Sequence, residues 1–337
     1  MSPTFRRYIL TKLGWYLIAL AAAVSLNFFL PRLVPGNPVD LIVSRFLQGG
    51  GGGASASKTY QAFITQFDLD KPLSGQFFAY LVNILHGDLG QSFSLFPARV
   101  TTLISQAVPW TLALQLPAIL LGWILGNVLG ALAAYKRGAF DRNLFVTALA
   151  VSSIPYYALA IVLLYVFAVA VPIFPSAGGY SFGTIPNLSW GFMVDALTHY
   201  LLPFLSLLVI AIGGQAVGMR SMAIYELGSD YVNYATSLGV SDRRVLGYVF
   251  RNAMLPQITG LALALGTLVG GALITEIVFS YPGIGTLLFN AINANDYPLI
   301  QGVTLIIIVA VLLANFLVDL AYGVIDPRIR AARSGER

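Results

Sequence analysis

Charged residues are scarce in this sequence. Asp, Glu, Lys and Arg make up only 10% of the 337 residues, whereas hydrophobic residues make up 57%. Soluble domains carry about 25% charged residues, so a soluble enzyme of this size would need far more charge to cover its surface. A disordered chain would in turn be poorer in apolar residues. Together with a mean hydropathy of +0.79, these fractions predict a polytopic, all-α membrane protein.

Cysteine is absent and histidine occurs only twice. The lack of cysteine excludes disulfides, thiolate metal sites and a cysteine nucleophile. His86 and His199 come without the supporting carboxylates of a metal or catalytic cluster, so we expect ordinary surface or interface histidines. We therefore predict a non-catalytic chain with no bound metal or cofactor.

Long charge-free stretches indicate where the chain crosses the membrane, because a spanning helix needs about 20 apolar residues. Pro109 places the start of the second helix near Trp110, and a Pro-, Gly- and Ser-rich loop follows the third near residue 171. The sequence predicts six transmembrane helices, at residues 13–31, 110–135, 143–171, 196–219, 252–275 and 297–318.

Lys and Arg residues are distributed unevenly between the two sides of these six helices. The two termini and the loops after helices 2 and 4 hold fourteen, whereas the other three loops hold five, all of them in the long first loop. Cytoplasmic loops carry the excess of Lys and Arg, and long loops obey this rule least. Both termini are therefore predicted to be cytoplasmic, and the net charge of +5 reflects topology rather than binding to nucleic acid.

The helices divide the chain into four parts. Residues 1–30 form the cytoplasmic N-terminus and first helix, and residues 31–106 form a polar extracytoplasmic segment. Its glycine-rich stretch 48–57 lacks the Lys-Ser/Thr of a phosphate loop and is expected to be a flexible spacer. Residues 107–325 form the transmembrane core, with a cytoplasmic loop at 219–256, and residues 326–337 form a cytoplasmic tail.

The cytoplasmic loop has a helical pattern of its own. Gly239 is expected to end a first helix, Ser241 and Asp242 to cap a second short helix over 243–252, and Pro256 to mark the entry to the fifth transmembrane helix. Such a helical pair suits insertion into a groove of another protein, and a connector lying on the membrane is the alternative. The first helix is predicted from Tyr231, Tyr234, Ala235 and Leu238 at helical spacing.

The stretch YVNYATSLGVSDRRVLGYVFRNAMLP resembles the coupling loop of binding-protein-dependent ABC importer permeases. That loop carries a Glu-Ala-Ala…Gly signature and ends in Leu-Pro. Here Asn233 replaces Glu, Tyr234 replaces the first Ala, and the interval from Gly239 to Pro256 is longer than in sugar and phosphate permeases. The peptide/nickel branch tolerates both departures. Four other stretches resemble the same branch: RLVPGNPVD, GDLGQSF, FSYPGIGTLLFNAINANDYPLIQG and DPRIR.

The resemblance implies a type I ABC importer permease fold in a bacterial or archaeal inner membrane. It implies three kinds of protein partner: a second, homologous permease subunit, two ATPase subunits that hold ATP and Mg, and an extracytoplasmic solute-binding protein. Oligopeptides or oligosaccharides are the implied substrates, with nickel or another small solute as the alternative. The residues implied in ATPase coupling are Tyr231, Ala235, Gly239, Val240, Ser241, Asp242, Arg243, Arg244 and Pro256.

Four residues near or within the membrane are candidates for gating or for lining a pore. Glu276 and Asp319 are carboxylates close to the ends of predicted transmembrane helices. Charge within the membrane is rare, and it is usually paired or functional. Gly214 and Gly270 permit close approach of helices. An ion-coupled secondary transporter is the alternative of another class, but it would be expected to show repeated halves and charge near the midplane. A membrane enzyme would need a polar catalytic cluster.

Overall fold

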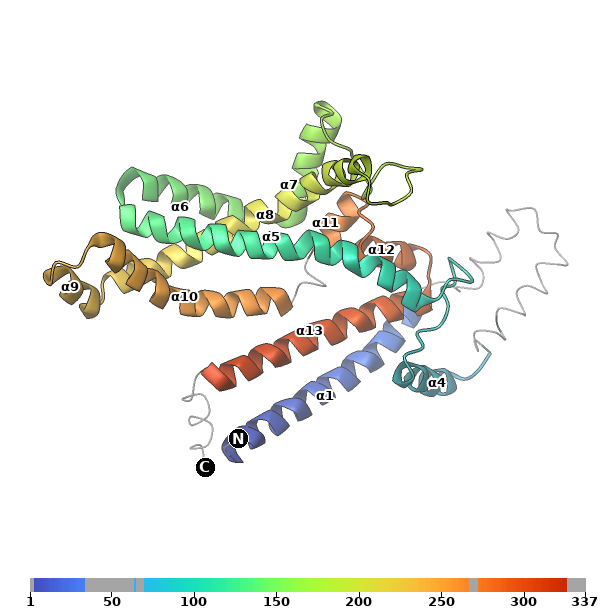
Figure 1. Ribbon diagram of the computed structural model, residues 1–337. Helices are drawn as coiled ribbons and strands as arrows, with labels where there is room; N and C mark the ends of the chain where they lie inside the picture. The colour runs from blue at the N-terminus through green and yellow to red at the C-terminus, as the bar shows by residue number, and fades with distance from the viewer. Residues whose placement is uncertain (1–2, 34–63, 65–69, 267–271, 326–337) are drawn as a thin grey trace. The chain divides into compact units, whose positions relative to one another are not determined.

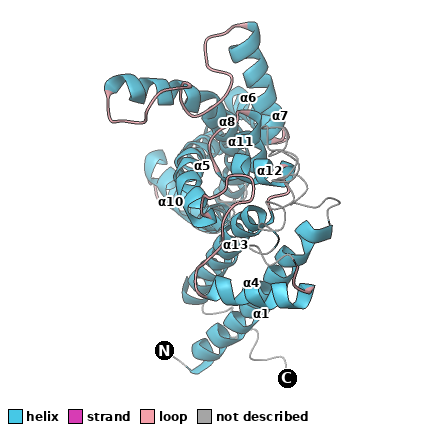
Figure 2. Cartoon of the chain, turned by 90° about the vertical axis from the view of Figure 1, so that its right-hand side faces the viewer, coloured by secondary structure: helices cyan, strands magenta, loops and turns pink. Residues whose placement is uncertain are grey.

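The computed structural model describes residues 3–33, 64, 70–266 and 272–325. These residues are almost entirely helical, and Figure 2 shows helices joined by loops with no strand in the described part of the chain. The glycine-rich stretch 48–57, Gly270 and the tail 326–337 lie outside the described residues. The chain forms two compact units: Met1–Pro109 with Gly283–Phe316 and Tyr322–Arg337, and Trp110–Pro282 with Leu317–Ala321.

Four helices are long and apolar enough to cross a membrane, or five if a bent pair counts as one span. The fifth predicted span, 252–275, begins within helix α10 (Asp242–Gly266) and runs into residues outside the described part. The all-α membrane architecture is thus confirmed, whereas the count of six and the cytoplasmic termini stay predictions. The four long helices are α1 (Pro3–Leu33), α5 (Val100–Lys136), α8 (Trp190–Leu227) and α13 (Tyr297–Ile325).

The predicted start of the second helix near Trp110 is wrong. Helix α5 begins ten residues earlier, at Val100, and Pro109 lies inside it. The Val100 N–H donates to the Gly90 carbonyl, and an antiparallel bridge joins Gln91 to Arg99. These backbone contacts fix the helix start, and a proline further on removes only one backbone donor.

The predicted single helix over 143–171 is also wrong. Helix α6 (Gly138–Ser152) and helix α7 (Tyr156–Leu164) meet at a bend of 92° when α7 is taken with the π-helical turn η1 (Tyr165–Ala170). Ser152 and Ser153 both donate their hydroxyls to the Leu149 carbonyl, which competes with the backbone ladder. Pro155 then disfavours helical geometry at the residue before it, so the helix ends here.

In the first unit, buried polar side chains join α1 to α13 and to α4 (Leu73–Leu85). The Asn27 amide donates to the Gln301 carbonyl at 2.8 Å and to the Tyr80 hydroxyl at 3.0 Å, and it accepts from the Thr304 hydroxyl. Phe28, fully buried beside it, packs against Tyr80. Polar contacts of this kind hold helices together where lipid gives no hydrophobic driving force between them. Figure 1 shows α1 running beside α13 within this unit.

A buried carboxylate ties the loop before α5 to the start of α13. Asp296, fully buried, accepts hydrogen bonds from the Ser92 hydroxyl at 2.5 Å and from the Ser94 backbone N–H at 2.8 Å and hydroxyl at 2.7 Å. Two of the stretches that carry the family resemblance, GDLGQSF and NANDYP, therefore meet at this carboxylate. Helix α12 (Ile284–Asn293) precedes it.

Replacing this carboxylate is expected to destabilise the first unit. Asp296→Ala leaves the buried donors of Ser92 and Ser94 unsatisfied, and hydrogen bonds to charged groups contribute about 1.5–3 kcal/mol each. We expect the unfolding free energy to fall by about 3 kcal/mol or more, measured by thermal unfolding of the purified chain. Asp88→Ala is the control, because Asp88 is exposed and accepts a local bond from the Gly90 N–H. An equal loss of unfolding free energy in the two variants would contradict this role of Asp296.

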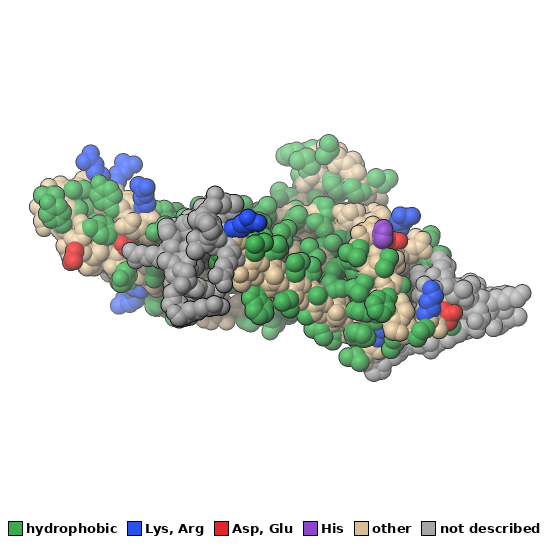
Figure 3. All heavy atoms as spheres, turned by 90° about the horizontal axis from the view of Figure 1, so that it is seen from below, with side chains coloured by type: hydrophobic (Ala, Val, Ile, Leu, Met, Phe, Trp, Pro, Cys, Tyr) green, Lys and Arg blue, Asp and Glu red, His purple; other side chains and the backbone are tan. Residues whose placement is uncertain are grey.

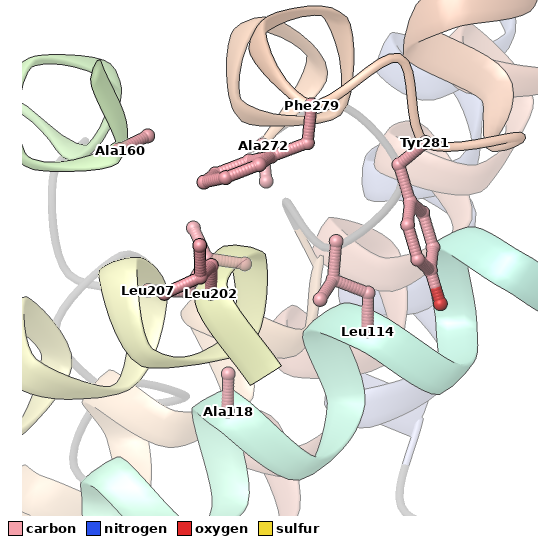
Figure 4. Close-up of a cluster of buried hydrophobic side chains, with 8 residues drawn as sticks. All are labelled: Leu114, Ala118, Ala160, Leu202, Leu207, Ala272, Phe279 and Tyr281. Carbon is pink, nitrogen blue, oxygen red and sulfur yellow. The ribbon is translucent and has the colours of Figure 1, made fainter. Parts of the chain in front are cut away.

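The second unit is built around a cluster of buried apolar side chains from α5, α7, α8 and the region of α11 (Leu273–Val278). In Figure 4 the Phe279 ring reaches toward Leu202 and Leu207 of α8, and Tyr281 lies beside Leu114 of α5. The Phe279 carbonyl accepts from the Gly178 N–H at 2.8 Å, which attaches the loop between η1 and α8 to this core. The cluster comprises Leu114, Ala118, Ala160, Leu202, Leu207, Ala272, Phe279 and Tyr281.

Candidate coupling hairpin

A helical hairpin follows the end of α8, as the sequence predicts. Its first arm is α9 (Asp230–Ser237), and its second arm is the beginning of α10. Asp230 lies in the first turn of α9, where a negative charge favours the helix dipole. We call residues 230–252 the coupling hairpin.

Two backbone hydrogen bonds at Gly239 and Val240 cap the C-terminal end of α9. The φ of Gly239 is +74°, a conformation that glycine adopts without penalty. The Gly239 N–H donates to the Thr236 carbonyl at 2.9 Å and the Val240 N–H to the Ala235 carbonyl at 3.1 Å, which is the Schellman arrangement. The prediction that Gly239 ends the first helix is confirmed, and the hairpin turn is held by backbone hydrogen bonds.

The prediction of a separate short helix over 243–252 is wrong. Helix α10 begins at Asp242 and continues without interruption to Gly266, so Pro256 lies within it rather than at its start. A proline removes only one backbone donor. Val249 and Ala253, both buried, hold the helix before Pro256, and the Trp123 indole N–H donates to the Gln257 carbonyl just after it. One continuous helix therefore links the hairpin turn to the predicted fifth transmembrane span.

The hairpin packs on the ends of two membrane helices. Val232 of α9 and Val245 and Val249 of α10 form a buried cluster with Ala134 of α5 and Ala223 of α8. Figure 1 shows α9 and the start of α10 at one end of α8. The hairpin is thus a folded module fixed to the ends of α5 and α8. Its packing favours the protein-docking interpretation over a connector that lies on the membrane.

The outer face of the hairpin carries aromatic and basic side chains. Tyr234 and Leu238 are 68% and 65% exposed. Arg243 and Arg244 are also exposed, and Figure 3 shows blue side chains gathered at this end of the second unit. Burial, followed by the hydrogen bond that Tyr231 donates to the Glu226 carboxylate at 2.6 Å, raises the pKa of the Tyr231 phenol. A face of this composition suits a protein groove lined with acidic and apolar groups.

The structure brings eight of the nine predicted coupling residues together. Tyr231 and Ala235 lie on α9, residues 239–241 form the turn, and residues 242–244 begin α10. Pro256 is the exception, because it lies about four turns further along α10. Tyr234 and Leu238, which share the helical spacing of the loop, are additional exposed residues of the same surface.

The structure shows an ion pair near the hairpin that the sequence did not predict. The Arg220 guanidinium of α8 binds the Asp141 carboxylate of α6 through two hydrogen bonds, of 2.5 and 2.7 Å. The same guanidinium lies 4.4 Å from the centre of the Phe145 ring. This pair fixes α6 to the part of α8 that supports the hairpin.

Three of the four predicted gating or pore residues are described by the structure, and they lie on separate elements. Glu276 is fully buried in α11, Asp319 is partly buried in α13, and Gly214 lies in α8. Gly270 falls outside the described residues. Their roles stay predictions. In the described part of the chain, no cluster of three or more His, Asp or Glu residues could hold a metal ion.

Glycines other than the predicted Gly214 allow two helices of the second unit to pack closely. Along α5, Gly122, Gly126 and Gly130 face α8, and a Cβ at Gly130 would lie 2.4 Å from the Ala216 carbonyl oxygen. Figure 1 shows α5 running alongside α8. A Cβ at Gly214 would meet no atom within 4 Å. The spacing of four residues is the signature of close helix approach in membranes.

These two glycines give a matched test. Gly130→Ala forces backbone atoms of α8 to move and is expected to cost about 1–3 kcal/mol of unfolding free energy. Gly214→Ala has room for the methyl group and adds helix propensity of about 1 kcal/mol, so stability should hold or rise. Thermal unfolding measures both. A Gly214→Ala variant that folds normally yet transports poorly would support a pore role, whereas equal destabilisation by both variants would contradict the packing described here.

Comparison with known proteins agrees with this architecture. Residues 126–331 match the family described as binding-protein-dependent transport system inner membrane component. The di/tripeptide transport system permease protein DppB of Pseudomonas aeruginosa is 33% identical over 341 residues, covering 97% of this chain and 99% of that protein. The dipeptide transport system permease protein DppB of Escherichia coli K12 is 33% identical over 345 residues, covering 96% and 98%.

A third relative extends the similarity to another genus. A Brucella ovis protein with a provisional peptide-permease name is 37% identical over 329 residues, covering 96% of this chain and 99% of that protein. The family match includes the entire coupling hairpin, all of α8 and the end of α5 that supports the hairpin. This chain therefore belongs to the family of inner membrane components of binding-protein-dependent transport systems, and it is a multi-pass protein of the inner membrane.

Proposed function

We propose that this chain is the permease subunit of an ATP-driven importer that passes short peptides across the inner membrane. The relatives named for dipeptide and di/tripeptide transport align over nearly their whole length, which favours peptides over oligosaccharides or nickel. In this proposal a solute-binding protein delivers the substrate, and a homologous second permease completes the pore. Two partner ATPase subunits bind ATP and Mg, so this chain performs transport without catalysis.

The observation that carries the proposal is the continuity of α10 from the hairpin turn to Gly266. The exposed turn, with Arg243 and Arg244, would dock into an ATPase subunit. Closure of the ATPase pair would then displace a rigid helix that is continuous with the predicted fifth transmembrane span. Because the turn is capped and the arms are packed on α5 and α8, force applied at the tip would not be absorbed by a flexible loop.

Reconstitution with the cognate partners tests the proposal. We expect proteoliposomes that contain both permeases and both ATPases to accumulate labelled di- and tripeptides when binding protein and ATP are supplied. Maltooligosaccharides and Ni²⁺ serve as substrate controls in the same vesicles. Uptake driven by an ion gradient with this chain alone would favour the secondary-transporter alternative, and uptake of the other substrates without peptides would overturn the peptide assignment.

A further inference from the structure

A groove in the second unit has no role in the proposed transport cycle. It has a volume of about 460 Å³ and is formed by α5, α6 and α8. Asn143 and Thr147 contribute its polar groups, and its other lining residues are apolar or glycine. Its volume is in the range of sites that hold a small ligand.

Residue size explains why the groove exists. Ala148 and Ala216 are buried and form its floor, where Gly213 lets α8 approach the backbone of α6: a Cβ there would lie 2.9 Å from the Ala148 carbonyl oxygen. Phe140 and Val209 are 43% and 38% exposed and stand at its edges. Small residues below and larger ones at the rim leave an open apolar trough along helices that lie in the membrane.

One end of this trough is positively charged. The Lys136 ammonium lies 5.3 Å from the centre of the Phe140 ring, which lines the groove. Arg137, the N-cap residue of α6, and Arg142, in its second turn, are exposed, and α6 begins without a side-chain cap. The Asp141 carboxylate does not neutralise these cations, because Arg220 already binds both of its oxygens. The Lys and Arg distribution predicts that this end faces the cytoplasm.

The geometry points to a binding site for one anionic phospholipid of the inner leaflet. An acyl chain would lie in the apolar trough, and the headgroup phosphate would meet Lys136, Arg137 and the free N–H groups at the start of α6. Helix N-termini favour anions, and basic sites between membrane helices on the cytoplasmic side bind anionic headgroups. The charge at one end and the apolar lining along the rest match a phospholipid better than a second protein helix.

Native mass spectrometry of the full chain in detergent, titrated with phosphatidylglycerol or phosphatidylcholine, tests this site. We expect phosphatidylglycerol to be retained preferentially. Lys136→Gln should reduce that preference about five-fold, because each cation near an anionic surface contributes about 1 kcal/mol. Thr147→Phe, which fills the trough from an exposed position, should reduce binding of both lipids.

Arg6→Gln is the matched control, because it removes an exposed cation from α1. Equal retention of the two lipids, or an equal loss in Arg6→Gln and Lys136→Gln, would overturn the site. Displacement of the bound lipid by soluble glycerophosphoglycerol would show that the headgroup contacts alone bind it. Loss of the lipid when the second permease is added would show that the trough is a protein interface, which would also overturn the proposal.

Discussion

Reversing both arginines at the turn of the coupling hairpin is expected to abolish co-purification of the ATPase subunits. Arg243 and Arg244 are exposed at the start of α10, so Arg243→Glu/Arg244→Glu should leave the permease folded. Loss of one partner of a charge pair at an interface costs about 2–5 kcal/mol, which corresponds to at least about a 30-fold weaker complex. Peptide-stimulated ATP hydrolysis in the assembled transporter should fall with the association.

Arg251→Glu is the control for this reversal. Arg251 is exposed on the same helix but lies two turns beyond the tip, so the control changes one charge without changing the docking face. We expect the ATPase subunits to co-purify with Arg251→Glu nearly as with the unchanged chain. If the double variant still retains the ATPase subunits, or if the control loses them equally, docking through the turn is refuted. The family assignment would be unaffected by either result.

The sequence predicted the parts of this fold that depend on local pattern. The long apolar runs identified the helices because lipid requires every backbone group to be bonded within the segment. The end of α9 was predictable for a similar reason, because the Schellman bonds join residues within five positions of one another. Gly239 was therefore enough to predict where the turn lies.

Proline was a poor guide to helix boundaries. Pro155 separates α6 from α7, whereas Pro109 and Pro256 lie inside helices α5 and α10. The difference lies in the neighbours. Two serine hydroxyls bind the Leu149 carbonyl before Pro155, whereas buried side chains hold α10 before Pro256 and Trp123 binds the Gln257 carbonyl after it. Such packing comes from distant segments and leaves no local pattern.

Contacts between distant segments were not predictable from one sequence. The Asp141–Arg220 pair joins residues 79 positions apart, and Asp296 meets Ser92 across 204 positions. Arg220 and Arg142 were both counted as loop cations in predicting the topology, but that count could not show that Arg220 is paired. The groove of α5, α6 and α8 could not be predicted from the sequence either, because its floor depends on which small residues of α6 and α8 meet.

The Asp141–Arg220 pair should be the most costly charge to remove from the second unit. Arg220→Met leaves the Asp141 carboxylate, whose side chain is 17% exposed, without its cation. Breaking a buried pair costs about 3–5 kcal/mol, and the partial exposure here lowers the expected loss to about 2 kcal/mol. Thermal unfolding should detect this loss, and coupled uptake should fall because α6 no longer holds the part of α8 that carries the hairpin.

A double-mutant cycle separates the ion pair from the packing of the Arg220 side chain. Asp141→Asn/Arg220→Met removes both charges, so it should recover much of the stability lost in Arg220→Met alone, because no uncompensated carboxylate remains. Arg142→Met, which removes an exposed cation next to Asp141, should change stability by less than about 0.5 kcal/mol. If the double variant is as unstable as the single one, Arg220 stabilises α8 through its contact with Phe145 rather than through Asp141.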